Sequence, residues 1–170
     1  MSNYGSYQPF NMIDGLGVRC SIYFSGCPLK CKGCYNKAIQ DKNYGFEFTQ
    51  DNVDQILEDC SKSYVSGLSI LGGEPMENTE AILDLIKQFR NKFGNTKDIW
   101  LWSGYTFEEI NYKNIPDQLL IVNNIDVLVD GRFVLSKFIK GLPFRGSTNQ
   151  RIIDVSKTLE NGKVVEMELD

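Results

Sequence analysis

Short, continuously apolar segments of this chain alternate with segments whose apolar residues recur at helical spacing. Residues 18–25, 67–71, 98–102 and 125–129 are rich in β-branched, aromatic and leucine side chains and predict buried strands. Residues 50–61, 79–93 and 106–110 predict helices, the first with Thr49 as its N-cap. The alternation indicates βαβ units and a parallel sheet, and about four units are too few to close an eight-stranded barrel. We therefore expect an α/β fold built as a partial, open parallel (βα) barrel.

The C-terminal stretch has a different pattern. Residues 152–159 and 164–169 flank Glu160-Asn161-Gly162-Lys163, and Asn-Gly between two such runs is a strong hairpin signal. The 170 residues are enough for one domain with a substantial core. We expect residues 1–170 to form that single domain, with about 150–170 as a C-terminal loop and β-hairpin extension.

Glycine-rich or polar motifs follow several of the predicted strands. They are Gly72-Gly73-Glu74-Pro75, Trp102-Ser103-Gly104-Tyr105 and Asp130-Gly131-Arg132-Phe133. Ligands of open parallel sheets bind beyond the carboxyl ends of the strands, so these motifs predict one shared site. Each also has a structural interpretation: a tight turn for the glycines, core packing for the aromatic residues, and a turn role for Asp130.

Three cysteines, Cys27, Cys31 and Cys34, follow the first predicted strand with C-x3-C-x2-C spacing. Iron–sulfur clusters are usually held by four cysteines, so three thiolates would leave one iron of a [4Fe-4S] cluster open. A closed zinc site would have to recruit Cys20 or Cys60, because the chain has no histidine. We expect these two to be small buried hydrophobic residues, although Cys20 as a fourth ligand would close the site.

The composition favours neither nucleic acid nor membrane as a partner. The chain has 22 acidic and 18 basic residues, for a net charge of −4, and contains no apolar run long enough to span a bilayer. The first residues lack the basic and apolar regions of a signal peptide. We therefore expect a cytoplasmic protein in a reducing compartment.

Together, these motifs resemble the family of activating components of anaerobic (class III) ribonucleoside-triphosphate reductases, within the radical S-adenosylmethionine (SAM) superfamily. The residue before the third cysteine is commonly aromatic in the superfamily, whereas here Gly33 precedes it and Tyr35 follows it, as in this subgroup. The likeness covers nearly the whole chain, in Asp14-Gly-Leu-Gly17, Ser25-Gly-Cys27, Cys31-Lys-Gly-Cys34-Tyr-Asn36, Gly72-Gly-Glu-Pro75, Ile99-Trp-Leu-Trp-Ser-Gly-Tyr105, Val129-Asp-Gly-Arg-Phe133 and Arg145-Gly-Ser-Thr-Asn-Gln-Arg151.

The resemblance implies a fold of the radical SAM type and an oxidoreductase that activates a glycyl-radical enzyme. A reduced [4Fe-4S] cluster would cleave SAM to methionine and a 5′-deoxyadenosyl radical, which would take a hydrogen atom from a glycine of the reductase. The partners implied are the large catalytic subunit of the reductase, in a heteromeric complex, and a one-electron donor such as a flavodoxin. The sequence leaves open whether the chain also forms a homodimer.

The resemblance also implies a set of site residues. Iron would be held by Cys27, Cys31 and Cys34, and SAM would lie against Gly33, Cys34, Tyr35, Gly72, Gly73, Glu74, Tyr105 and Asp130. Three alternatives remain open: an activase of another glycyl-radical enzyme, a radical SAM enzyme with a small-molecule substrate, and a closed-cluster electron-transfer or structural metal protein. The polar segment from Phe144 to Arg151 is expected to be a loop. The sequence leaves open whether it faces a bound anion, a partner protein or only solvent.

Overall fold

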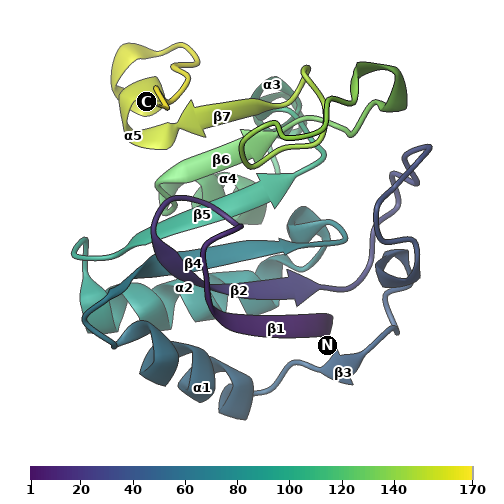
Figure 1. The fold of residues 1–170 in the computed structure, drawn as a ribbon. Coiled ribbons are helices and arrows are strands. Elements are labelled where there is room, and N and C mark those ends of the chain that lie inside the picture. Colours follow the sequence, from purple (N-terminus) through teal and green to yellow (C-terminus); the bar gives the residue numbers. More distant parts are fainter. Residues whose placement is uncertain (170) are drawn as a thin grey trace.

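The computed structural model describes residues 1–169 and contains a seven-stranded sheet in the order β3-β1-β2-β4-β5-β6-β7 (Figure 1). The expected parallel core is confirmed, because β2, β4, β5 and β6 pair in parallel. The outer strands β1, β3 and β7 pair antiparallel to their neighbours. The bounds of the strands are β1 Asn3–Asn11, β2 Val18–Phe24, β3 Phe46–Glu47, β4 Val65–Gly72, β5 Asp98–Ser103, β6 Val127–Asp130 and β7 Arg151–Asp154.

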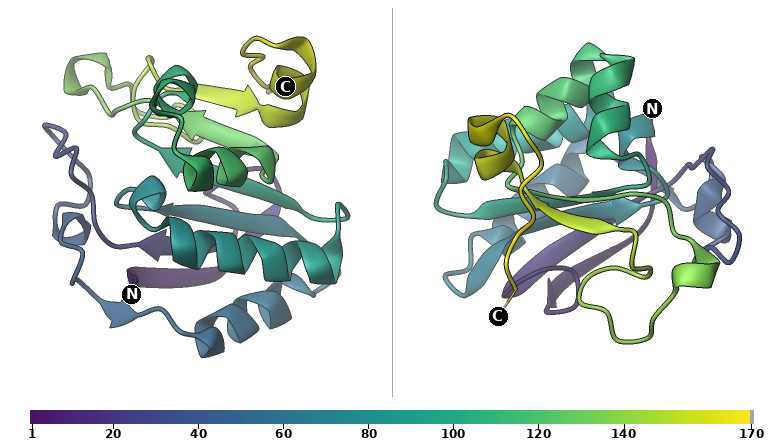
Figure 2. Two further views of the ribbon diagram at one scale, coloured as in Figure 1. Left: turned by 180° about the vertical axis from the view of Figure 1, so that it is seen from behind. Right: turned by 90° about the horizontal axis from the view of Figure 1, so that it is seen from above.

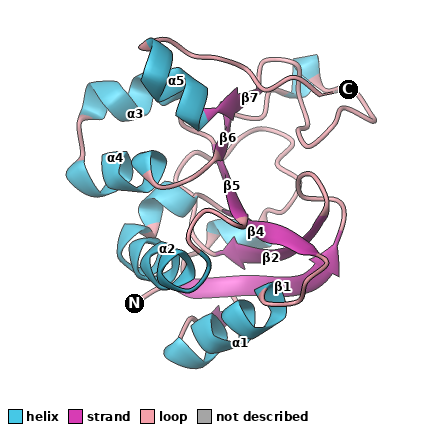
Figure 3. Ribbon diagram, turned by 90° about the vertical axis from the view of Figure 1, so that its left-hand side faces the viewer, coloured by secondary structure: helices cyan, strands magenta, loops and turns pink. Residues whose placement is uncertain are grey.

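The helices α1 to α4 lie on one face of the sheet, and long loops lie on the other (Figures 2 and 3). The predicted helices are all present, and Asn52 accepts a hydrogen bond from the Thr49 backbone N–H in a capping box at the start of α1. None of the helices within residues 1–169 is long and apolar enough to cross a membrane. Their bounds are α1 Gln50–Cys60, α2 Thr79–Phe93, α3 Phe107–Lys113, α4 Pro116–Asn123 and α5 Val155–Asn161, with 3-10 turns at Ala38–Gln40, Pro75–Glu77 and Leu135–Lys137.

The core is divided by the sheet. Alternate residues of β2 and β4, such as Ile22 and Ile70, are buried against the helices in the larger cluster. Trp100 and Val129 point to the opposite face, where Phe144 and residues near the C-terminus cover a smaller cluster. Side chains of a strand alternate between the two faces of its sheet, so each central strand contributes to both layers.

The predicted C-terminal hairpin is wrong, because residues 155–161 form helix α5. The Asp154 side chain caps this helix by accepting a hydrogen bond from the Lys157 N–H, and Gly162 ends it with a φ of 71°. Asn161 and Gly162 therefore form a helix C-terminus instead of a two-residue turn. After the helix, the chain returns to β7, where the Met167 N–H donates to the Ile152 carbonyl at 2.7 Å.

Candidate functional site

The carboxyl ends of β4 and β5 are joined by the buried side chain of Glu74. One carboxylate oxygen accepts the Gly104 N–H at 2.6 Å, and the other accepts the Ser103 hydroxyl at 2.8 Å and the Met76 N–H at 2.9 Å. Burial raises the pKa of Glu74 to about 7, although these hydrogen bonds oppose the rise. Two of the motifs expected at one edge of the sheet are thus held together by one carboxyl group.

The same glycine-rich segment is bonded to the base of the loop that carries the cysteines. The Glu74 N–H donates to the Gly26 carbonyl at 2.7 Å, and the Gly73 N–H donates to Phe24 at 3.0 Å. A Cβ at Gly73 would lie 2.5 Å from the Gly26 carbonyl oxygen, so the close approach of the two backbones requires glycine. The loop base is also closed on itself, because Gly26 and Cys27 donate to the carbonyls of Ile39 and Gln40.

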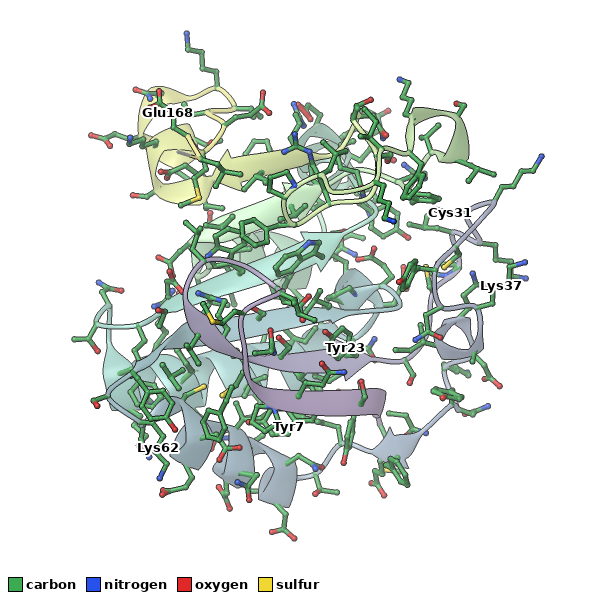
Figure 4. The ribbon with its side chains drawn as sticks, in the orientation of Figure 1. Tyr7, Tyr23, Cys31, Lys37, Lys62 and Glu168 are labelled. Atoms are coloured by element: carbon green, nitrogen blue, oxygen red, sulfur yellow. The ribbon has the colours of Figure 1, made fainter. Side chains whose placement is uncertain are left out.

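From this base, the cysteine loop extends over the ends of the neighbouring strands. Leu29 reaches Gly104 after β5, where a Cβ would overlap the leucine side chain. Gly33, with a φ of 77°, lies against Leu135 beyond β6, and a Cβ there would be 3.0 Å from the leucine methyl group. Figure 4 shows Cys31 and Lys37 on this loop, at the side of the molecule where the strands β2, β4, β5 and β6 end.

Cys27, Cys31 and Cys34 are all free thiols, partly exposed, and lie on this one loop. The Cys34 N–H donates to the Cys31 carbonyl at 3.0 Å in a turn. Burial raises the pKa of the Cys27 thiol, and the charge of Glu74 adds to the rise. Within residues 1–169, no three cysteine, histidine or acidic side chains are already arranged to hold a metal ion.

Cys20 and Cys60 lie elsewhere, in the core between the sheet and the helices. Both are fully buried, which confirms the expectation that they are small buried hydrophobic residues. The structure therefore brings neither of them to the loop that carries the other three cysteines.

Tyr105 and Asp130 lie at the same edge but already have partners. The Tyr105 hydroxyl donates to Glu77 at 2.8 Å. Asp130 is fully buried, and its carboxylate accepts the Phe107 N–H and pairs with Arg151 at 2.6 Å. A ribose hydroxyl at Asp130 would have to share oxygens that already accept these hydrogen bonds.

Tyr35 differs from the other candidates because its side chain is fully exposed. A cavity of about 520 Å³ is lined by the base of the same loop at Cys27, by Lys42 and by the first turn of α2 at Thr79. The cysteine loop thus contributes Cys27 to a cavity and exposes Tyr35 to solvent.

Three residues position the site without having been expected to do so, although Gly26 and Ser103 belong to motifs noted in the sequence. Gly26 supplies the carbonyl that accepts the Glu74 N–H, Ser103 donates to the Glu74 carboxylate, and the Asn78 side chain donates to the backbone of Ser25 and Glu74. The available signal was the Ser-Gly pair, which occurs both before Cys27 and before Tyr105.

Comparisons with known proteins show which family the chain is similar to. A family model described as a 4Fe-4S single cluster domain matches residues 13–153, and so spans the cysteine loop and the strands that support it. A relative from Vibrio cholerae is 40% identical over 154 residues, which cover 88% of this chain and 96% of the relative.

Relatives from other sources have similar coverage. One from Escherichia coli K12 is 40% identical over 152 residues, covering 87% of this chain and 96% of its own. One from Enterobacteria phage T4 is 38% identical over 152 residues, which cover 88% of this chain and 92% of the relative. All three are called anaerobic ribonucleoside-triphosphate reductase-activating protein.

Proposed function

The chain belongs to the family of anaerobic ribonucleoside-triphosphate reductase-activating proteins, and we propose that it activates such a reductase by reductive cleavage of SAM. Its fold would be the partial, open barrel of the radical SAM type, with β2, β4, β5 and β6 as the parallel strands. The observation that carries the proposal is the direct bonding of the Gly72–Glu74 segment to the base of the cysteine loop.

The donor set of the cysteine loop fits a [4Fe-4S] cluster. Cys27, Cys31 and Cys34 are free, partly exposed and carried by one loop whose base is fixed by backbone hydrogen bonds, so all three are accessible as thiolate ligands. Three protein ligands leave one coordination position for SAM. When bound, the cluster supplies the electron that cleaves SAM to methionine and a radical, which removes a hydrogen atom from a glycine of the reductase.

The protein's own groups position the substrate. The Glu74 carboxylate is already used to join two loops, so the backbone of Gly72 and Gly73 is left to hold the amino group of SAM. Gly33 and Tyr35 flank Cys34 and would contact SAM beside the cluster. Tyr105 would line the SAM site from one side and is held by Glu77, whereas the fully buried Asp130 would support the site by fixing the loop after β6 through Arg151.

The partner must supply a glycine to this edge of the sheet. The names of the relatives identify a reductase as the protein that they activate. We infer the same partner here, namely the large catalytic subunit, together with a one-electron donor such as a flavodoxin. The enzyme would be an oxidoreductase that activates a glycyl-radical enzyme.

The test is spectroscopic and anaerobic. The protein is reconstituted with iron and sulfide, reduced, and examined by electron paramagnetic resonance with and without SAM. We expect a [4Fe-4S]⁺ signal that changes when SAM is added, and a glycyl radical when the reductase subunit is then supplied. A cluster signal indifferent to SAM would favour the closed electron-transfer site, and a radical formed only on another glycyl-radical enzyme would change the assigned partner.

A further inference from the structure

Two segments that frame the cysteine thiols carry a strong excess of positive charge. Residues 26–40 and 131–153 together contain eight of the 18 basic residues and none of the 22 acidic ones, although the whole chain has a net charge of −4. The basic residues are Lys30, Lys32, Lys37, Arg132, Lys137, Lys140, Arg145 and Arg151.

The two segments lie side by side beyond the ends of the strands. Gly33 of the first lies against Phe133 and Leu135 of the second. Figures 1 and 4 show both loops projecting from the same side of the sheet, with Cys31 on the first of them. The two basic segments are therefore neighbours on the side of the molecule that carries the cysteines.

Most of this charge is not neutralised within the chain. Arg132 pairs with Glu109, and Arg151 pairs with Asp130 and Glu108. The five lysines of the two segments are exposed and form no ion pair within residues 1–169. A cluster of unpaired charge of one sign creates a field that attracts a partner of the opposite sign.

Large apolar side chains are exposed between the lysines of the second segment. Leu135, Phe138 and Ile139 remain 49%, 51% and 52% exposed on either side of Lys137. Apolar residues flanked by charged ones are typical of a protein docking surface, with an apolar centre and a charged rim. A nucleic acid partner would be attracted by the lysines through its phosphates but would not use the three exposed apolar side chains, so a protein partner fits this surface better.

We propose that Lys30, Lys32, Lys37 and residues 135–140 form a docking surface for the reductase subunit, which would present acidic residues around an apolar patch. The inference rests on the proposed function, because the subunit that supplies the glycine must contact the segments that frame the thiols. Charge complementarity of this kind acts mainly on the rate of association and makes it dependent on salt.

The experiment compares two double variants that reverse the same amount of charge. Lys137→Glu with Lys140→Glu changes the docking surface, whereas Lys87→Glu with Lys157→Glu changes exposed lysines of α2 and α5. Binding to the purified reductase subunit is measured at low and high salt, and SAM cleavage by dithionite-reduced protein is measured without the subunit. We expect the first variant to bind about tenfold more weakly or worse at low salt, and the second to bind like the wild type.

Further outcomes separate this inference from the proposed function. Ile139→Ser should also weaken binding, and every variant should cleave SAM at the wild-type rate. If both double variants bind the subunit like the wild type, the docking surface is overturned but the proposed function stands. Loss of SAM cleavage by the first variant would also overturn the docking surface, because the lysines would then act on the SAM site and not on the partner. If that variant binds the subunit normally but loses reduction by flavodoxin, or binding of single-stranded DNA, the surface serves a different partner. A wild-type protein that cleaves SAM but does not bind the subunit would overturn the proposed function itself.

Discussion

Glu74 accepts a hydrogen bond from the backbone N–H of Gly104 at 2.6 Å, and this contact joins the loops that follow β4 and β5. The same residue donates its own N–H to Gly26 at the base of the cysteine loop. One fully buried residue therefore connects the three segments that would surround SAM. The arrangement gives the single carboxylate of this otherwise glycine-rich motif a structural role, in which it accepts hydrogen bonds from both loops.

The protonation of Glu74 should appear in the stability of the metal-free protein. Its pKa is raised by burial from 4.5 to about 7, so the folded chain keeps a proton that the unfolded chain releases in this interval. The contribution of Glu74 to stability is therefore highest below pH 4.5, falls by about 3 kcal/mol as the pH rises to 7, and is constant above that.

Urea unfolding of the wild type and of Glu74→Gln between pH 5 and 8 tests this expectation. The difference between the two isolates the carboxyl group, because other titrating groups are common to both. The stability of the wild type relative to the variant should decline with rising pH, and a relative stability that is flat or rises would contradict the assignment.

The ion pair between Asp130 and Arg151 should matter more for stability than the pair between Glu109 and Arg132. The Asp130 side chain is 1% exposed, so Arg151→Met leaves a buried carboxylate without its partner and should cost about 3 kcal/mol. The other pair is exposed on both sides, and Arg132→Met should cost less than about 1 kcal/mol. Denaturant midpoints of both variants measure the contrast, and equal losses would show that the burial of Asp130 is energetically unimportant.

The close approach of Gly73 to the loop base should make an added methyl group costly. In Gly73→Ala the new Cβ meets the backbone oxygen of Gly26, which cannot rotate away, and we expect a loss of roughly 1–3 kcal/mol together with poor iron incorporation. In Gly104→Ala the obstacle is the flexible Leu29 side chain, so the loss should be smaller. Thermal unfolding and iron content are measured for both variants. A larger loss of stability in Gly104→Ala than in Gly73→Ala would contradict the prediction and would show that the Leu29 contact is the more rigid one.

Cluster binding should depend on the loop cysteines and not on the core cysteines. Cys31→Ser should lose cluster-dependent cleavage of SAM, whereas Cys20→Ala should retain it because Cys20 is enclosed between the sheet and the helices. Iron content and 5′-deoxyadenosine formation are the measurements. Retained cleavage in Cys31→Ser would refute its assignment, and loss of the cluster in Cys20→Ala would support a closed, four-cysteine site.

The parallel core could be predicted because its strands are buried on both faces and hence continuously apolar. Strand β1 could not, since Asn3–Asn11 is an outer strand of mixed polarity in which no residue is fully buried. Helix α4 was missed because Pro116–Asn123 is short and mostly apolar, without a clear polar face. Strong periodic patterns reveal elements that separate a core from solvent, and neither of these segments has one.

The candidate site was predictable in its location but not in its connections. The positions of the glycines and cysteines after strands indicated one edge of the sheet, which the contacts among Gly26, Glu74 and Gly104 confirm. The internal partners of Glu74 and Asp130 could not be foreseen, because they come from residues distant in sequence, such as Ser103 and Arg151. The hairpin predicted from Asn161-Gly162 was wrong for a related reason. The same dipeptide occurs in hairpin turns and at helix ends, and the Asp154 cap favours the helix here.

The closed base of the cysteine loop has a consequence for how such proteins can diversify. The bonds from Gly26 and Cys27 to Ile39 and Gln40 hold the two ends of the intervening segment together. Because the ends are joined through backbone groups, the exposed lysines of the segment can be replaced without removing the hydrogen bonds that fix its base. Partner choice and fold stability can therefore be selected separately in this architecture.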